Sequence, residues 1–506
     1  MHRVAAPGMI SAAKESSMSN ITGSMLYDLV TCPTRVHLDL FGTGVRDEVS
    51  PFVQLLWAQG ATHEEQVMAN LDRPFEDLSG LSGAERLRRT TEAMANGVEL
   101  IYHGRIAHKD MLGDPDLLEK VGNGYIAGDI KSGAGIEGME DSGRLKKTYA
   151  VQLGLYTEIL EGMGCSAGRT PYVLDVRCER IPYPLDKAQG SKTPQTWWGF
   201  YEGVRDQVRQ IAARQAAPLA CSGAPCKLCW WYSVCKADVQ ARDDLSRIPE
   251  LGRSKRDVLA DRIGTVRELA TANLDTFLQG KKTIFPGIGP DTLQKFKTRA
   301  QLLCDPTSRP LLVQPVSFPQ VDTELFFDIE VDPFRDCCYL HGFIERKSGN
   351  NATERFVPFF VDDPAGDQER QMFSAALEYM RSFHSVAIYY YSKYERTIYR
   401  KLREKYPDVI SEADLEQIFA PNLAIDLYFD VVKKATEWPT TDLSIKTLAS
   451  YLGFHWRDAN PSGAASIEWY DKFVKEPTNE NRMRILEYNE DDCRATRVLL
   501  DGIRAL

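Results

Sequence analysis

Carboxylates and a lysine in the first third of the chain are spaced in a way that suits metal-dependent chemistry. Asp129 and Lys131 are two positions apart in GYIAGDIKSG, which has the character of a strand, so their side chains should share one face. Asp116 closes the pattern G-x-x-D thirteen residues earlier. Carboxylate oxygens are the ligands that Mg²⁺ prefers, and a nearby lysine stabilises the charge that develops on a phosphate. Taken alone, D-x-K is also typical of a surface ion pair.

Two further pairs flank these residues. His63-Glu64 lies in a segment, 25–70, whose apolar spacing predicts helices. Gln152 and Tyr156 are four apart on a predicted helix over 144–163, so they share a face and suit contacts to DNA. For His63, the alternative is a histidine hydrogen-bonded in the core.

The order H-E, G-x-x-D, D-x-K, Q-x-x-x-Y resembles that of the PD-(D/E)xK nucleases of the RecB type. The resemblance implies a restriction-endonuclease-like fold in which His63, Asp116 and Asp129 bind the metal. It also implies that Lys131 is catalytic beside Asp116 and Asp129. Gln152 and Tyr156 would then support DNA binding.

Three cysteines form a C-x2-C-x5-C pattern: Cys226, Cys229 and Cys235. Thiolates select zinc or an iron–sulfur cluster, and zinc ribbons usually pair two C-x2-C knuckles, whereas this sequence has one. Cys32 is the best candidate for a fourth ligand, and Cys221 is the alternative. The pattern resembles the iron–sulfur subgroup of RecB-like nucleases, which implies a 4Fe-4S cluster that staples the two ends of the nuclease domain. Zinc is the less favoured alternative.

A second set of carboxylates lies near the C-terminus. Asp328 and Glu330 are two apart in FFDIEVD, and Tyr488 and Asp492 are four apart in YNEDDCRAT. D-x-E at the start of an αβ module and Y-x-x-x-D at its end resemble the DnaQ-like exonucleases of the RNase H fold. The resemblance implies that carboxylates hold metal ions and that Tyr488 positions the attacking water. At a middle position where that family normally has Asp, this chain has Glu395, which reaches further.

The departure at Glu395 leaves three interpretations of the second module open: an active exonuclease, a nucleic-acid-binding domain without cleavage, and a structural domain. Asp426 is either a further carboxylate near the site or a residue that ends a strand.

Composition sets broad limits. The chain has 506 residues, a net charge of −10 and a pI of about 5.5, which argues against a binder driven by overall charge. Residues 251–300 carry ten Lys/Arg against five Asp/Glu, a local balance of +5 that suits either DNA contact or a solvated helix face. The sequence lacks a run of about 18 apolar residues and a signal-peptide pattern, so a cytoplasmic protein without membrane contact is expected.

We expect an α/β protein with four segments. A disordered tail covers 1–24, and the PD-(D/E)xK domain with its cluster covers 25–240. A helical linker covers 241–320, in which FPGIGP at 285–290 indicates a helix-hairpin-helix or simply a tight turn between helices. Lys295, Lys297 and Arg299 follow that turn. The RNase H-like domain covers 321–506.

Together these patterns predict an Mg²⁺- or Mn²⁺-dependent nuclease that hydrolyses DNA, on single strands or ends, in repair or processing. The arrangement as a whole resembles RecB-family nucleases with a C-terminal RNase H-like domain. The sequence has no G-x-x-x-x-G-K-[ST], so any helicase would be a separate partner. The alternatives are an RNase, an iron–sulfur scaffold that binds nucleic acid without cleavage, and a redox sensor.

Overall fold

The computed structural model describes residues 20–137, 143–190 and 193–506, and its chain divides into two compact units. The first unit comprises the residues up to Val45 together with Ala58–Leu219, and the second comprises Arg46–Trp57 and Ala220–Leu506. Most of the predicted tail, 1–19, lies outside the described residues, and strand β1 (Ile21–Thr22) already begins within the range expected to be tail. The division at 219 precedes the predicted boundary at 240, so the three-cysteine segment groups with the second unit.

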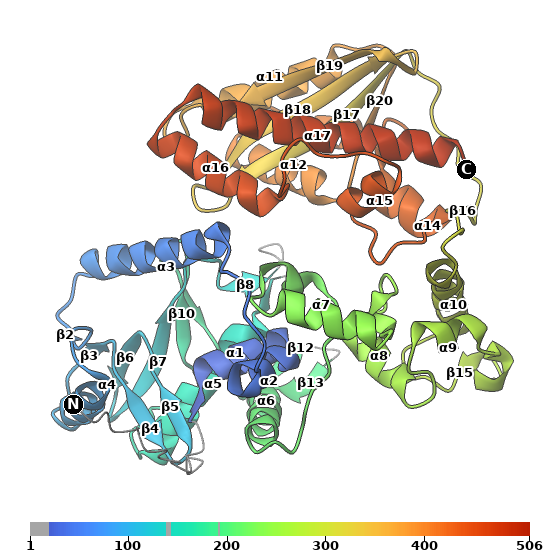
Figure 1. Cartoon of the computed structure of the whole chain (residues 1–506). Coiled ribbons are helices and arrows are strands. Elements are labelled where there is room, and N and C mark those ends of the chain that lie inside the picture. The colour runs from blue at the N-terminus through green and yellow to red at the C-terminus, as the bar shows by residue number, and fades with distance from the viewer. Residues whose placement is uncertain (1–19, 138–142, 191–192) are drawn as a thin grey trace, which may run out of the picture. The chain divides into compact units, whose positions relative to one another are not determined.

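The first unit is built on a six-stranded sheet in the order β11-β10-β7-β6-β3-β2. Strands β10 and β7 run parallel, whereas β7, β6 and β3 are antiparallel neighbours (Figure 1). The bounds are β2 Glu76–Asp77, β3 Leu100–Tyr102, β6 Leu117–Val121, β7 Gly124–Ile130, β10 Tyr172–Leu174 and β11 Arg180–Pro182. Strand β7 confirms the strand character expected of GYIAGDIKSG.

Helix α5 (Lys147–Gly162) packs against β7 and forms the centre of the first unit. Its apolar residues surround the helix rather than forming a stripe, which is typical of a helix buried on most sides. Leu153, Leu155 and Ile159 are all fully buried in the main core cluster. The other helices in this part of the chain are α1 Gly23–Thr31, α2 Pro33–Phe41, α3 Pro51–Ala69, α4 Gly83–Ala95 and α6 Trp197–Ala212.

The middle segment has a hydrophobic core of its own, to which Leu259, Leu269 and Phe296 contribute. Its helices are α7 Tyr232–Ala241, α8 Arg253–Ala260, α9 Val266–Thr271 and α10 Pro290–Cys304. Gly287 has φ +77° in the FPGIGP turn, a conformation that favours glycine. The Pro-rich stretch beyond it is anchored, because β16 (Leu311–Leu312) pairs antiparallel with β22 (Thr436–Glu437).

The second unit carries a five-stranded sheet in the order β19-β18-β17-β20-β21. Strands β17, β18 and β19 are antiparallel, and β20 and β21 extend the sheet in parallel with β17. The bounds are β17 Thr323–Asp332, β18 Cys337–Lys347, β19 Asn350–Phe360, β20 Val386–Tyr390 and β21 Ala424–Asp426. Strand β17 contains the FFDIEVD sequence, with Asp328 and Glu330 two positions apart on it.

Alternation along β17 assigns its side chains to two faces. Leu325, Phe327 and Ile329 pack into a core with helices α11 (Gln368–Arg381), α12 (Tyr394–Lys405) and α13 (Glu412–Ile418). Phe326 belongs to a different core, with α15 (Ile445–Tyr451) and α17 (Asn479–Arg504). Figure 1 shows α17 lying along the sheet, with α16 (Gly463–Lys475) beside it. The even-numbered positions of β17 therefore face α17.

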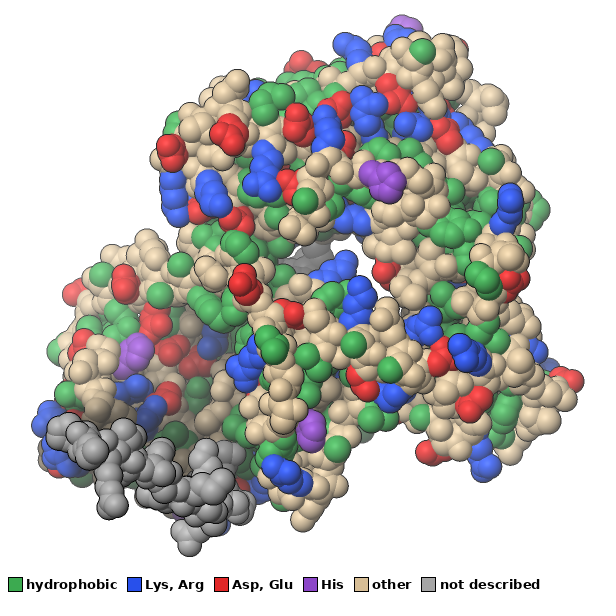
Figure 2. Space-filling model, viewed as in Figure 1, with side chains coloured by type: hydrophobic (Ala, Val, Ile, Leu, Met, Phe, Trp, Pro, Cys, Tyr) green, Lys and Arg blue, Asp and Glu red, His purple; other side chains and the backbone are tan. Residues whose placement is uncertain are grey.

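The outer surface of this domain mixes charges of both signs. In Figure 2, Lys and Arg side chains alternate with Asp and Glu over the region of α17. Arg494, for example, binds Glu354 at 2.8 Å and Glu490 at 2.9 Å. Within the part of the chain that the structure describes, no helix is both long and apolar enough to cross a bilayer.

Candidate functional site

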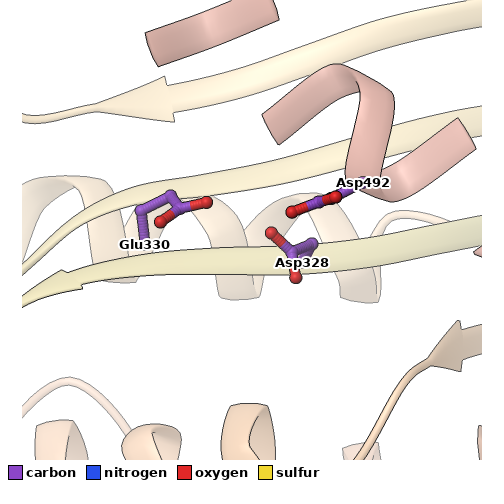
Figure 3. Close-up of side chains that lie close together, drawn as sticks. All are labelled: Asp328, Glu330 and Asp492. Carbon is purple, nitrogen blue, oxygen red and sulfur yellow. The ribbon is translucent and has the colours of Figure 1, made fainter. Parts of the chain in front are cut away.

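Three carboxylates meet where the middle of α17 crosses β17. Ligand atoms of Asp328, Glu330 and Asp492 all lie within 4.8 Å of one another, a spacing that could hold a metal ion. In Figure 3 the carboxylates of Asp328 and Asp492 point toward each other, one from the strand and one from the helix. The two-residue spacing on β17 puts Asp328 and Glu330 on the face that α17 covers. The donor set consists of hard oxygens, which suits Mg²⁺ or Mn²⁺.

Side-chain donors hold each of these carboxylates in place. Asn489, on the inner face of α17, donates from Nδ2 to Asp328 Oδ2 at 2.7 Å. Trp456 donates from Nε1 to Asp492 Oδ1 at 2.7 Å. Tyr339 donates from its hydroxyl to Glu330 at 3.4 Å. Such supporting bonds fix the orientation of ligands around a metal site.

One cation lies within the cluster. Lys446 Nζ is 3.0 Å from Asp492 Oδ1, and it donates to the Tyr488 hydroxyl, also at 3.0 Å. Tyr488 and Asp492 lie on the same face of α17, as their four-residue spacing predicts. The neighbouring Asp491 instead accepts from the backbone N–H and Nε of Arg457, at 2.8 and 3.0 Å.

The surroundings of Asp328 and Glu330 oppose the ionisation of both carboxylates. Burial, and then the charge of Asp492, raises the pKa of Asp328 well above its usual range. Burial, and then the charge of Asp328, does the same to the pKa of Glu330. The Lys446 ammonium acts in the opposite direction on both groups. Added positive charge therefore favours the ionisation of Asp328 and Glu330 together.

Glu395 sits close to this cluster but outside the ligand group. It lies in the first turn of α12, where it is buried, and its Oε2 meets no hydrogen-bond donor among the described residues. Burial, followed by the charge of Asp328, raises the pKa of Glu395. Asp426 ends β21 and accepts from the backbone N–H groups of Tyr428 and Phe429 at 3.0 Å. Asp426 thus ends β21 and caps the segment after it, while its charge also contributes to the raised pKa of Glu395.

Residues 325–503 match the model of the RNase_H superfamily. They form an RNase H-like domain. The match covers both strand carboxylates and the Tyr488–Asp492 pair of the helix, and the superfamily supports a nuclease-type function in general. No curated protein matches the chain.

Outside the RNase H-like domain, the first unit brings together the residues of its predicted site. Asp129 on β7 is buried, and Lys131 Nζ lies 2.8 Å from its Oδ2. Asp116 precedes β6, which pairs with β7, and its Oδ2 accepts from Ile130 N–H at 2.7 Å. The structure thus places D-x-K and G-x-x-D on neighbouring strands, with their side chains close together.

The same cluster shows strong charge coupling. Burial, followed by the charge of Asp129, raises the pKa of Asp116 to about 7. Although burial lowers the pKa of Lys131, the charges of Asp129 and Asp116 outweigh it and raise that pKa. Glu64 joins the group from α3, where it accepts from His103 Nε2 at 2.6 Å and from the Tyr102 hydroxyl at 3.0 Å. Sequence reasoning did not single out His103.

The remaining residues predicted for the first site have different surroundings. His63 Nε2 lies 3.2 Å from the backbone oxygen of Asp175. Tyr156 is 5% exposed and belongs to the core, with its hydroxyl 3.4 Å from the Asp114 carbonyl. Gln152 Oε1 is buried and finds no donor in the described parts of the chain. Tyr156 therefore lies inside the fold, and a contribution of these two residues to DNA binding stays a prediction.

The cysteines of the C-x2-C-x5-C pattern occupy a short turn and the helix after it. A 3-10 helix spans Ala224–Leu228, and the backbone N–H of Cys229 donates to the Cys226 carbonyl at 3.1 Å. The Trp231 N–H points to Cys229 Sγ at 3.5 Å, and Cys235 lies in the first turn of α7. Cys32 separates α1 from α2 in the first unit.

Several residues of the RNase H-like site were missed by the sequence analysis. Lys446 lies in SIKTLASYLGF, where Ser444 caps α15 by accepting from Thr447 N–H. Trp456 follows that helix, and Asn489 lies between two residues that were identified. Nothing in the local spacing of these donors distinguishes them from surface residues, because their role depends on how α15 packs against α17.

The cations after the FPGIGP turn are only partly available. Arg299 is fully buried and binds Glu437 and Glu250, and Lys295 Nζ lies 2.7 Å from the Lys433 carbonyl. Two of the three cations that follow the turn therefore join α10 to the RNase H-like domain.

Proposed function

We propose that the protein is a metal-dependent nuclease that hydrolyses phosphodiester bonds of DNA, on single strands or ends, in repair or processing. The observation that carries the proposal is the carboxylate group Asp328, Glu330 and Asp492 within an RNase H-like domain. Substrate class, strand preference and cellular role belong to the proposal. RNA as the substrate is the alternative within the same chemistry.

In this proposal, Asp328, Glu330 and Asp492 hold Mg²⁺ or Mn²⁺. A bound divalent ion lowers the pKa of a water molecule and neutralises charge on the phosphate. The chain's own contribution is orientation: Asn489 fixes Asp328 and Trp456 fixes Asp492. The Tyr488 hydroxyl, which accepts a hydrogen bond from Lys446, is directed to the same point and suits positioning of a water molecule.

A second nuclease site in the first unit is supported by a separate observation. Asp116, Asp129 and Lys131 converge from adjoining strands, the arrangement expected of a PD-(D/E)xK site. We propose that Asp116 and Asp129, with His63, hold a metal ion there and that Lys131 stabilises charge on the phosphate. Gln152 and Tyr156, both on α5, would support DNA binding there.

We further propose that Cys32, Cys226, Cys229 and Cys235 bind a 4Fe-4S cluster, with zinc as the less favoured ligand. The N–H of Trp231 near Cys229 Sγ supports this, since hydrogen bonds to sulfur accompany ligation of such clusters. Cys221 is the weaker alternative, because burial raises the pKa of its thiol. A raised pKa disfavours the thiolate, which is the form that binds a metal. A cluster-bearing scaffold that recruits a separate helicase is the competing function.

Cleavage of end-labelled single-stranded DNA with Mn²⁺ tests the proposal. Asp328→Asn and Asp129→Asn should each remove the activity of one site, and the double variant should be inactive. Asp336→Asn, whose side chain is 92% exposed, is the control and should cleave like the wild type. Cleavage undiminished in the double variant would reject both assignments. A wild-type protein that binds DNA or RNA but never cleaves either would support the scaffold function instead.

A further inference from the structure

Lys446 adds a positive charge to the acidic cluster of the RNase H-like site. Its Nζ lies 3.0 Å from Asp492 Oδ1 and 3.3 Å from Oδ2, so the ammonium faces both oxygens of one carboxylate. It also donates to the Tyr488 hydroxyl at 3.0 Å. Asp492 Oδ1 also accepts from Trp456 at 2.7 Å, so two donors fix the orientation of this carboxylate.

Aromatic rings confine the ammonium from other sides. Lys446 Nζ lies 5.1 Å from the ring centroid of Trp456 and 4.8 Å from that of Tyr488. A cation over an aromatic face is attracted by the ring's negative face. The helix that carries Lys446 is itself fixed, because Leu448 of α15 is buried in a core shared with Leu499 and Leu500 of α17. The position of Lys446 is therefore built into the domain.

Charge counting indicates what this cation does. Three ionised carboxylates carry a charge of −3, and Lys446 reduces it to −2, which one divalent ion would neutralise. Glu395, the position from which a further carboxylate would come, stays outside the ligand group. In two-metal nuclease sites the ions lie about 3.5–4 Å apart and share carboxylates. Here the ammonium lies against both oxygens of Asp492, so one of the three carboxylates already faces a fixed positive charge.

We propose that Lys446 takes the place of a second metal ion, so that the RNase H-like site binds one divalent cation. This inference rests on the proposed function, because it assumes that the triad binds metal at all. The ammonium would supply one fixed positive charge beside the carboxylates, where two-metal sites recruit a second ion from solution.

Counting bound Mn²⁺ tests this inference without reference to activity. The protein for this experiment carries Asp116→Ala and Asp129→Ala, so that the first unit adds no ions. Equilibrium binding should give one Mn²⁺ per chain, and further addition of Asp492→Asn should lower that number. Lys446→Met should raise it to two, with the EPR signature of two coupled Mn²⁺ ions, whereas Lys446→Arg should restore one.

Lys434→Met is the matched control, because Lys434 is exposed and pairs with Asp430. It should leave the count at one, and melting curves should show that every variant folds. Two ions bound with Lys446 intact, or one bound by Lys446→Met, would overturn the inference. No ion lost on Asp492→Asn would instead reject metal binding at the triad, and with it the proposed function.

Discussion

Single residues in both clusters show how burial and a neighbouring carboxylate raise a pKa. Asp116 is the clearest case, because burial and the charge of Asp129 raise its pKa to about 7 from the usual 3.8. In the metal-free folded protein, Asp116 therefore keeps a proton that the unfolded chain releases near pH 4. Its contribution to stability is fully present below the unfolded pKa and is lost as the pH rises through the folded pKa.

This linkage predicts the behaviour of Asp116→Asn, which cannot ionise. In EDTA, the wild type should lose more stability than the variant between about pH 5 and pH 8, by roughly 1–3 kcal/mol at about 1.4 kcal/mol per pKa unit. Thermal melting across this pH range measures the difference, with Asp336→Asn as an exposed control. Equal pH dependence in the wild type and Asp116→Asn would contradict the assigned pKa.

Packing between elements sets the geometry of the RNase H-like site. Strand β18 passes beneath α17 at Gly342, where an added Cβ would lie 1.6 Å from Asn489 Oδ1. Asn489 is the residue that orients Asp328. Only a residue without a side chain allows the helix to approach the strand so closely.

Gly342→Ala should therefore displace Asn489 and weaken Mn²⁺ binding by about tenfold or more, as loss of a residue that orients a metal ligand does. The added methyl group should also cost about 1–3 kcal/mol of stability. Gly366→Ala is the control, since its Cβ would meet no atom closer than 3.8 Å. Titration of both variants with Mn²⁺ measures the change in affinity. An unchanged affinity in Gly342→Ala would show that Asn489 is not needed for metal binding.

The sequence predicts those parts of the site whose residues are close together along the chain. Asp328 and Glu330 share a face because of the two-residue period of a strand. Tyr488 and Asp492 share a face because of the helical repeat. Spacing in the sequence therefore predicts both pairs. Lys446 enters the site only because α15 packs on α17, a contact that spacing does not encode. The resemblance to DnaQ-like proteins located the module, yet the placement of Glu395 outside the ligand group required the structure.

At the scale of the whole molecule, the middle segment is joined to the RNase H-like domain by buried charges. Arg299 on α10 is fully buried and binds Glu437 through Nε, while its Nη1 donates to the Pro249 carbonyl at 2.7 Å. Lys433 binds Glu250 at 2.6 Å and completes the network. The sequence analysis expected this segment to be a linker.

Arg299→Met should leave Glu437 buried without its partner and destabilise the second unit by about 3–5 kcal/mol. The matched control is Lys297→Met, two positions along the same helix. Chemical denaturation measures the loss of stability, and limited proteolysis should show earlier cleavage within 241–320 in Arg299→Met alone. If both variants unfold at the same denaturant concentration, the network does not hold the segment in place.

The central claim is that the RNase H-like domain is a metal-dependent nuclease centre. Anomalous diffraction from crystals soaked in Mn²⁺ tests it most directly, because it locates the ion independently of activity. We predict a manganese peak bounded by Asp328, Glu330 and Asp492 that disappears in Asp328→Asn. An ordered triad without a peak at saturating Mn²⁺ would contradict the account.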